Sequence, residues 1–136
     1  MKILEILTEK RKIGNVGERA AEKLLKKSGY KILERNYVAL GYEIDIIAYD
    51  REHTVFCEVK TRTLGKESNK ESRPASSVTP EKQKKIITVA KYYNANKNLS
   101  KKMRFDIIEV FVDDAKKVQD IKHLTGAFNY DTANKR

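Results

Sequence analysis

Residues 41–60 read GYEIDIIA, YDREH and TVFCEVK in succession, and this stretch decides the fold. Polar and apolar residues alternate over 41–48 and again over 54–60, as they do in half-buried strands. The polar break between the two runs, at residues 50–53, has the length of a hairpin turn. The stretch therefore predicts two antiparallel strands joined by a tight turn.

The expected register of this hairpin places two acids against each other. If residues 51–52 form the turn, paired residue numbers sum to 103, so Asp45 lies opposite Glu58 and Glu43 lies opposite Lys60. Directly opposed side chains are about 5 Å apart, and like charges there are destabilising. A divalent cation held by oxygen ligands would compensate for this repulsion. We therefore expect a metal site, with the ammonium of Lys60 beside it.

Two alternatives remain open for this hairpin. A three-residue loop would place Asp45 opposite Cys57 and would turn every side chain to the other face. The hydrophobic pattern opposes that slip, because the first register gathers apolar residues on one face, namely Ile44, Ile46, Ala48, Val55, Cys57 and Val59. The opposite face then carries the acids with large apolar neighbours: Glu43, Asp45, Ile47, Phe56, Glu58 and Lys60. The second alternative is a solvated face with a Glu43–Lys60 surface pair, worth at most about 1 kcal/mol.

Length and composition bound the class of protein. A chain of 136 residues suits one domain with one core. We expect no signal peptide at the start, because Glu5 interrupts its short apolar run, and no run approaches the roughly 20 apolar residues that span a bilayer. The lone cysteine, Cys57, forms no internal disulfide and is expected in the core. These features predict a cytoplasmic protein without a membrane partner.

The net charge of +10 is concentrated in one third of the chain. Residues 60–104 hold 13 Lys or Arg against 3 Asp or Glu, whereas the rest of the chain holds 16 of each. Such a charge distribution favours a polyanionic partner, of which nucleic acid is the commonest. Only Tyr92 and Tyr93 are aromatic in this stretch, which favours contact with the phosphate backbone over base stacking. The alternative is a basic surface that serves solubility alone.

Helix and strand patterns fill the rest of the chain. A helix is expected over 14–28, ended by Gly29, with Glu18 at the edge of its apolar stripe. A second helix is expected to begin with Thr79 as N-cap and Pro80 next, and to run to about residue 96. Further segments are an N-terminal arm (1–13), strands (30–38, 104–112 and 118–124), a mobile loop (61–79) and a tail (129–136). The order αβββαβ predicts one α/β (α+β) domain over residues 1–136, with a central mixed sheet flanked by helices.

The start of the second helix is unusually basic. Its first two turns contain Lys82, Gln83, Lys84 and Lys85. Basic residues are unfavourable near the positive end of a helix dipole, so their presence indicates another demand, such as phosphate binding.

Several of these residues together resemble a known superfamily. Glu18 on a helix, Asp45 on a strand and Glu58-Val59-Lys60 on the next strand resemble the PD-(D/E)xK nucleases. More narrowly, the chain resembles the YraN-type family of small bacterial nuclease-like proteins, which are similar to archaeal Holliday-junction resolvases. The matching stretches span nearly the whole chain: Gly14–Glu18, Asn36-Tyr37, Glu43–Ala48, Phe56–Arg62, Val78, Lys82-Gln83, Arg104–Asp106, His123 and Ala127-Phe128. Tyr42 stands where that family usually has Gly, so we expect altered packing there, with Tyr42 on the face opposite the acids.

The resemblance implies a restriction-endonuclease-like fold and a metal-dependent endonuclease that hydrolyses phosphodiesters in DNA, including branched, Holliday-junction-like DNA. Asp45, Glu58 and the backbone carbonyl of Val59 would bind Mg²⁺ or Mn²⁺. Lys60 would orient or deprotonate a water or neutralise charge on the phosphorane, and Glu18 would complete the site. Nucleic-acid contacts would come from Arg62, Lys82, Gln83, Lys84 and Lys85. Symmetric cutting of two strands by resolvases is compatible with a homodimer.

Two other functions remain as alternatives. One is a non-catalytic nucleic-acid-binding protein of the same fold, in which the acids are structural. The other is a protein-interaction scaffold, which only the composition supports. The presence of all four acid and lysine positions, Glu18, Asp45, Glu58 and Lys60, favours the enzyme.

Overall fold

The computed structural model describes residues 2–65, 78–97 and 102–133. The elements in these ranges are α1 (Ile3–Lys27), β1 (Lys31–Ala39), β2 (Tyr42–Tyr49), β3 (His53–Thr63), α2 (Pro80–Lys97), β4 (Lys102–Val112), β5 (Val118–Phe128) and α3 (Tyr130–Ala133). The strands form one sheet in the order β1-β2-β3-β4-β5, in which β3 and β4 are parallel and all other neighbours are antiparallel. The predicted single α+β domain with a mixed sheet is confirmed.

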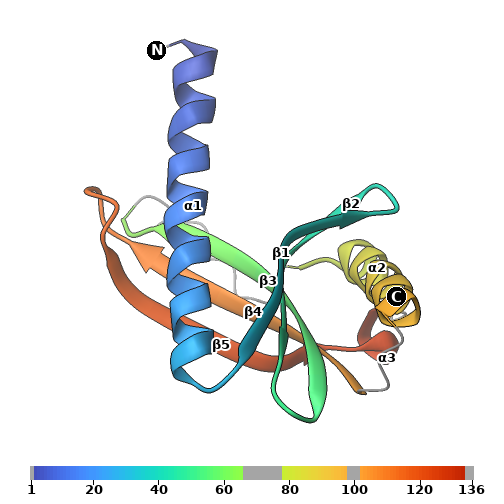
Figure 1. Ribbon diagram of the computed structural model, residues 1–136. Helices are drawn as coiled ribbons and strands as arrows, with labels where there is room; N and C mark the ends of the chain where they lie inside the picture. Colours follow the sequence, from blue (N-terminus) through green and yellow to red (C-terminus); the bar gives the residue numbers. More distant parts are fainter. Residues whose placement is uncertain (1, 66–77, 98–101, 134–136) are drawn as a thin grey trace.

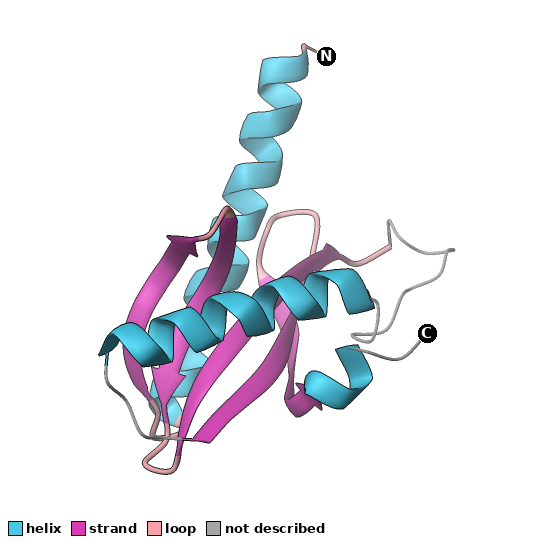
Figure 2. Ribbon diagram, turned by 90° about the vertical axis from the view of Figure 1, so that its right-hand side faces the viewer, coloured by secondary structure: helices cyan, strands magenta, loops and turns pink. Residues whose placement is uncertain are grey.

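The two long helices cover opposite faces of the sheet (Figure 1 and Figure 2). The connection from β3 through α2 to β4 is the crossover that a parallel pair requires. On the α2 face, Phe56, Phe105 and Phe128 stack in a row, with Tyr93 of α2 edge-on to Phe56. On the α1 face, Ala21 and Leu25 pack over the apolar residues of the central strands, which are Ile46, Ala48, Val55, Cys57, Ile108, Val110 and Val112. The core position predicted for Cys57 is confirmed.

The predicted helix ends agree with the structure at two places. Gly29 has a φ of +94°, and Tyr30 N–H donates to the carbonyl of Leu25 at 2.9 Å, so α1 ends where expected. Thr79 Oγ1 accepts a hydrogen bond from Lys82 N–H at 3.2 Å, which confirms Thr79 as the N-cap of α2. No helix in the described ranges has the length and apolar character needed to cross a membrane.

The ends of the chain differ from the sequence predictions. The helix predicted to begin at residue 14 begins at Ile3, and its first turns project beyond the sheet (Figure 1). The apolar stripe used for the prediction marks only the part that is buried on the sheet. The last strand extends to Phe128, and residues 130–133 form the short helix α3 where a tail was expected. Residues 61–63 of the predicted loop continue β3, and residues 66–77 lie outside the described ranges.

The hairpin register is confirmed. Ile46 pairs with Cys57, Ala48 pairs with Val55, and Asp50 N–H donates to the carbonyl of His53 at 3.2 Å across a two-residue turn. The slipped register with a three-residue loop is therefore wrong. Pairing of β2 with β3 ends at Ile46 and Cys57, so the two strands diverge from the next residues onward, and the end of the β1–β2 hairpin curves toward α2 (Figure 1).

The divergence of the strands overturns one predicted face. Ile44 and Tyr42 were expected on the face opposite the acids with Ile46, but both pack in the α2-side core with Ile47. The change of face occurs at Asp45, where Asn36 of β1, with a φ of +49°, is missing from the β1–β2 pairs. Ile44 and Ile47 are three residues apart and share a face, so the simple alternation of faces fails between them.

Candidate functional site

The acids Asp45 and Glu58 lie in the notch that opens where β2 leaves β3. They are the direct neighbours of the last paired residues of the two strands, Ile46 and Cys57. Val59 N–H donates to Asp45 Oδ2 at 2.7 Å, a contact that replaces the missing strand pairing. The side chain of Asp45 is thereby fixed against the β3 backbone, next to Glu58.

The acids in this notch are short of positive partners. Burial raises the pKa of Asp45 to about 7, and the nearby carboxylates of Glu58, Glu18 and Glu43 add to the rise, while the Val59 hydrogen bond opposes it. Burial also raises the pKa of Glu58, against the lowering effects of Lys60 and Lys82. Raised pKa values of this kind mark sites where carboxylates are gathered without full compensation.

A neighbouring carboxylate shows that the shortage is local to Asp45 and Glu58. Glu22 of α1 lies beside the cavity of about 290 Å³ that Asp45 and Glu18 also line. Arg35 donates to Glu22 from Nε at 2.7 Å and from Nη2 at 2.5 Å. This bidentate contact lowers the pKa of Glu22 to about 2. Arginine thus neutralises one wall of the cavity and leaves the Asp45 side anionic.

Glu18 reaches the site from α1, as the sequence predicted. Its approach depends on Gly17, because a Cβ at that position would lie 1.8 Å from Thr61 Oγ1 and 3.0 Å from Thr61 Cβ. Only glycine lets α1 come this close to β3 beside Lys60. The close helix–strand contact therefore fixes the distance from Glu18 to the acids of the sheet.

Asn36 is a site residue for which the sequence predicted no role. Its Nδ2 donates to Glu18 Oε1 at 3.2 Å and to Glu43 Oε2 at 2.8 Å, joining α1, β1 and β2. The Glu43–Lys60 surface pair, the alternative to a metal site, is not formed: Glu43 bonds to Asn36, and the Lys60 ammonium lies 3.9 Å from Glu58. The residue type could have indicated the irregular backbone at this position, because asparagine tolerates a positive φ better than most residues.

Tyr42 also belongs to the surroundings of the acids. Burial raises its pKa to about 12, with further contributions from the charges of Glu58 and Asp45. The ring packs against the α2-side core, and not on the face opposite the acids as the sequence predicted.

The donor set of the notch fits a hard divalent cation. Two carboxylates and the backbone of Val59 are oxygen donors, which Mg²⁺ and Mn²⁺ prefer. Three or more His, Cys, Asp or Glu side chains do not gather into a metal-binding group anywhere in the described ranges. A cation in this notch would thus take two carboxylates from the chain and complete its shell with the Val59 carbonyl and water.

The α2 residues predicted to contact nucleic acid differ in their exposure and in their distance from the notch. Lys82 lies close enough to Glu58 to lower the pKa of that acid, and Lys84 and Lys85 are exposed on α2 beside the tip of the β1–β2 hairpin. Gln83 is buried, and its Nε2 donates to the Val78 carbonyl at 2.9 Å. One part of the Gln83 side chain therefore serves the start of α2.

Arg62 is also engaged within the protein. Its Nε donates to Glu109 Oε2 at 3.2 Å, and Glu109 is buried. A nucleic-acid contact from Arg62 would have to share the guanidinium with this carboxylate.

A second polar cluster, around Asp106 of β4, is structural. Asp106 is fully buried; it accepts hydrogen bonds from Arg104 at 2.7 and 2.9 Å and from Gly126 N–H at 2.9 Å, and His123 Nε2 lies 2.8 Å away. Arg104 also contacts Asp50 at 3.0 Å and the Tyr30 hydroxyl at 2.7 Å. Both oxygens of Asp106 are satisfied by protein groups, and these contacts lower its pKa despite its burial. The cluster ties strands together and leaves the notch as the candidate site.

The fold and the notch define a small α+β protein with an anionic site between two diverging strands. Residues 17–110 match the Uncharacterised protein family UPF0102, and the chain belongs to this family. It is 41% identical over 121 residues to the UPF0102 protein TTE1452 of Caldanaerobacter subterraneus subsp. tengcongensis, covering 88% of this chain and 96% of that protein. It is 42% identical over 119 residues to the UPF0102 protein CA_C1763 of Clostridium acetobutylicum, covering 87% and 94%. A UPF0102 protein of Clostridium perfringens is 44% identical over 119 residues, with 85% and 93% covered.

Proposed function

We propose that this protein is a Mg²⁺- or Mn²⁺-dependent endonuclease that hydrolyses phosphodiester bonds of DNA. The observation that carries the proposal is the half-buried pair Asp45 and Glu58, both with raised pKa values and with Lys60 3.9 Å from Glu58. Such a pair is unfavourable as a purely structural feature, because nothing described in the notch neutralises both charges. A divalent cation held by these two carboxylates would do so.

Each residue of the notch has a part in this chemistry. A bound divalent cation would polarise the scissile phosphate and lower the pKa of a coordinated water. Asp45 and Glu58 would hold it, with Asp45 oriented by the Val59 hydrogen bond. Lys60 would orient the attacking water or neutralise charge that develops on the phosphate. Glu18, held by Asn36, would accept a hydrogen bond from an outer water.

The basic residues around the notch support a nucleic-acid substrate. Lys82, Lys84 and Lys85 lie on the first turns of α2, and Lys82 is near enough to influence Glu58. A nucleic-acid strand whose phosphates bind these lysines would extend toward the notch. Branched, Holliday-junction-like DNA is the substrate form that the resemblance to resolvases suggests.

The alternative function is nucleic-acid binding without cleavage. The same basic residues would bind the phosphate backbone, and the acids would then be a structural remnant. The bidentate Glu22–Arg35 pair is how this fold neutralises a carboxylate that has only a structural part, whereas the charged groups that shift the pKa of Asp45 are other carboxylates.

Cleavage of linear, flapped and four-way DNA with Mg²⁺ or Mn²⁺ separates these functions. The wild type should cleave at least one substrate, and Lys60→Ala should reduce the rate by about 10²–10³ while DNA affinity changes only a few-fold. The control is Lys31→Ala, an exposed lysine outside the notch, which should keep full activity. Absence of divalent-dependent cleavage by the wild type on every substrate would leave the binding function in its place.

A further inference from the structure

The first turns of α1 expose an apolar surface that nothing in the described chain covers. Ile3 and Leu4 are each 73% exposed, Leu7 is 53% exposed and Ile6 is 40% exposed. This segment, residues 3–9, is called the α1 tip here, and it extends past the sheet (Figure 1). Isolated apolar residues on a surface are ordinary, but four within five positions at the end of a projecting helix form a patch.

The tip repeats the apolar pattern of the buried part of its own helix. Ile3 and Ala21, Ile6 and Leu24, and Leu7 and Leu25 are each 18 residues apart, which is about five turns of α-helix. The members of each pair therefore lie on the same side of α1. Ala21 and Leu25 are fully buried against the sheet, whereas the tip has no sheet beneath it.

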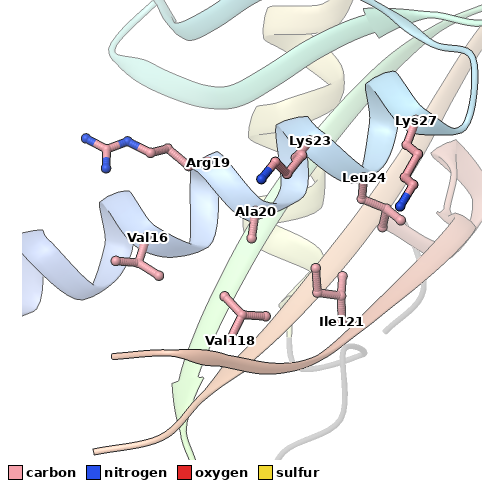
Figure 3. Close-up of a pocket in the computed structure, with 8 residues that line it drawn as sticks. All are labelled: Val16, Arg19, Ala20, Lys23, Leu24, Lys27, Val118 and Ile121. Atoms are coloured by element: carbon pink, nitrogen blue, oxygen red, sulfur yellow. The ribbon is translucent and has the colours of Figure 1, made fainter. Parts of the chain in front are cut away.

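A cavity of the described structure lies beside the same helix. The α1–β5 groove has a volume of about 560 Å³. Its floor is apolar and consists of Val16, Ala20, Leu24, Val118 and Ile121. Figure 3 shows these side chains facing one another from the helix and the strand, with the basic residues Arg19, Lys23 and Lys27 around them.

Charge distinguishes the tip from the groove. The tip carries Glu5 and Glu9 and no Lys or Arg, in a chain whose net charge is +10. The rim of the groove carries only basic charges. Glu5 is 18 residues from Lys23, and Glu9 is 18 residues from Lys27, so all four lie along one side of α1. Glu9 also pairs with Lys116 at 2.8 Å, at an exposed position where a second cation can approach.

We infer that two copies of this chain associate through antiparallel α1 helices, with the α1 tip of each copy seated in the α1–β5 groove of the other. The two-fold axis is perpendicular to the plane that contains both helices. Side chains on one side of that plane in the first helix therefore lie on the same side of it in the second helix. The acids of each tip then meet the basic rim of the other copy, and the apolar tip meets the apolar floor. The α1 tip and the α1–β5 groove both involve α1. One two-fold arrangement therefore covers the tip and the groove of each of the two copies, as in an isologous dimer.

Sedimentation analysis over about 1–100 μM tests this interface. The wild type should be a dimer in this range, and Ile6→Glu/Leu7→Glu should be a monomer, because the charges would be buried in an apolar groove. Both positions are partly exposed, so the variant should keep the wild-type circular dichroism and melting profile. The matched control is Val38→Glu/Leu40→Glu in the β1–β2 hairpin, where the two residues are 65% and 61% exposed. This variant should remain dimeric.

Charge reversal tests the orientation. Glu5→Lys/Glu9→Lys should raise the dissociation constant about tenfold or more, and adding Lys23→Glu/Lys27→Glu should restore it. Ile6→Cys/Leu24→Cys should form an intermolecular disulfide on mild oxidation, whereas Ile6→Cys alone should not, because antiparallel helices hold the two residues 6 about 27 Å apart. A wild type that is monomeric throughout, or a dimer that survives Ile6→Glu/Leu7→Glu, would overturn the inference.

Discussion

Val59 N–H donates a hydrogen bond to Asp45 Oδ2 at 2.7 Å at the point where β2 and β3 stop pairing. A side-chain carboxylate here takes the place of a backbone carbonyl in the sheet. The consequence is that the strands separate by the width of a site without leaving the Val59 N–H unsatisfied. The same contact immobilises Asp45 beside Glu58, so the opening of the sheet and the placement of the acids have one cause.

Removing either acid should remove divalent-cation binding. Isothermal titration of the wild type with Mn²⁺ should show binding that weakens strongly in Asp45→Asn and in Glu58→Gln, because each change deletes an anionic oxygen from a hard-cation site. Asp131→Asn, at an exposed position on α3, is the control and should bind as the wild type does. Wild-type binding in both notch variants would show that the cation does not bind at Asp45 and Glu58.

The raised pKa of Asp45 predicts a particular pH dependence of stability. In metal-free buffer the folded protein holds this proton up to about pH 7, whereas the unfolded chain releases it near the ordinary pKa of 3.8. The free energy of unfolding should therefore fall as the pH rises through this window and level off above it. Urea unfolding should show Asp45→Asn gaining about 2–4 kcal/mol relative to the wild type between pH 4 and pH 8. If the free energy of unfolding depended on pH in the same way in both proteins, the raised pKa of Asp45 would be contradicted.

Gly17 and Gly14 should respond oppositely to the same substitution. Gly17→Ala should destabilise the protein by about 1–3 kcal/mol, because the new methyl meets Thr61. Gly14→Ala, on the same helix with nothing within 4 Å, should stabilise it by up to about 1 kcal/mol through helix propensity. Thermal or urea unfolding of the two variants gives the comparison, and a neutral Gly17→Ala would mean that α1 can move away from β3 freely.

Asn36 should be sensitive to charge more than to shape. Asn36→Asp keeps the size of the side chain and tolerates the positive φ, but it places a third carboxylate against Glu18 and Glu43. Its loss of stability relative to the wild type should be about 1 kcal/mol at low salt and should shrink at high salt, which screens the repulsion between the carboxylates. Asn36→Gly, which also suits the backbone, should show no such salt dependence in the same unfolding measurements.

Nucleic-acid affinity should depend steeply on salt through α2. Replacing Lys82, Lys84 and Lys85 with Ala should flatten the dependence of log K on log salt by up to about one unit for each phosphate that the variant no longer binds. The matched control replaces three exposed lysines elsewhere, Lys31, Lys117 and Lys122. Fluorescence anisotropy with duplex and four-way DNA measures both slopes. An unchanged slope in the α2 variant would place the nucleic acid on another surface.

The sequence by itself determined the hairpin and its register. Alternation has a period of two residues, and a two-residue turn fixes the sum of paired positions, so local rules alone bring Asp45 and Glu58 next to the last paired residues of the two strands. The caps of α2 and the end of α1 were likewise readable, because Thr79, Pro80 and Gly29 act on their immediate neighbours.

Only the tertiary structure decided which carboxylates are neutralised by a basic partner. Glu22 and Asp45 are both acids next to apolar residues in the sequence, yet one meets Arg35, thirteen residues along the chain, and the other meets more acids. The turn of Ile44 and Tyr42 toward α2, and the burial of Gln83, also depend on how a strand and a helix distant in sequence pack together. The periodicity of the sequence indicates which residues share a face of one helix or strand. Charge compensation depends on distances between several elements, and these distances are set by how the elements pack.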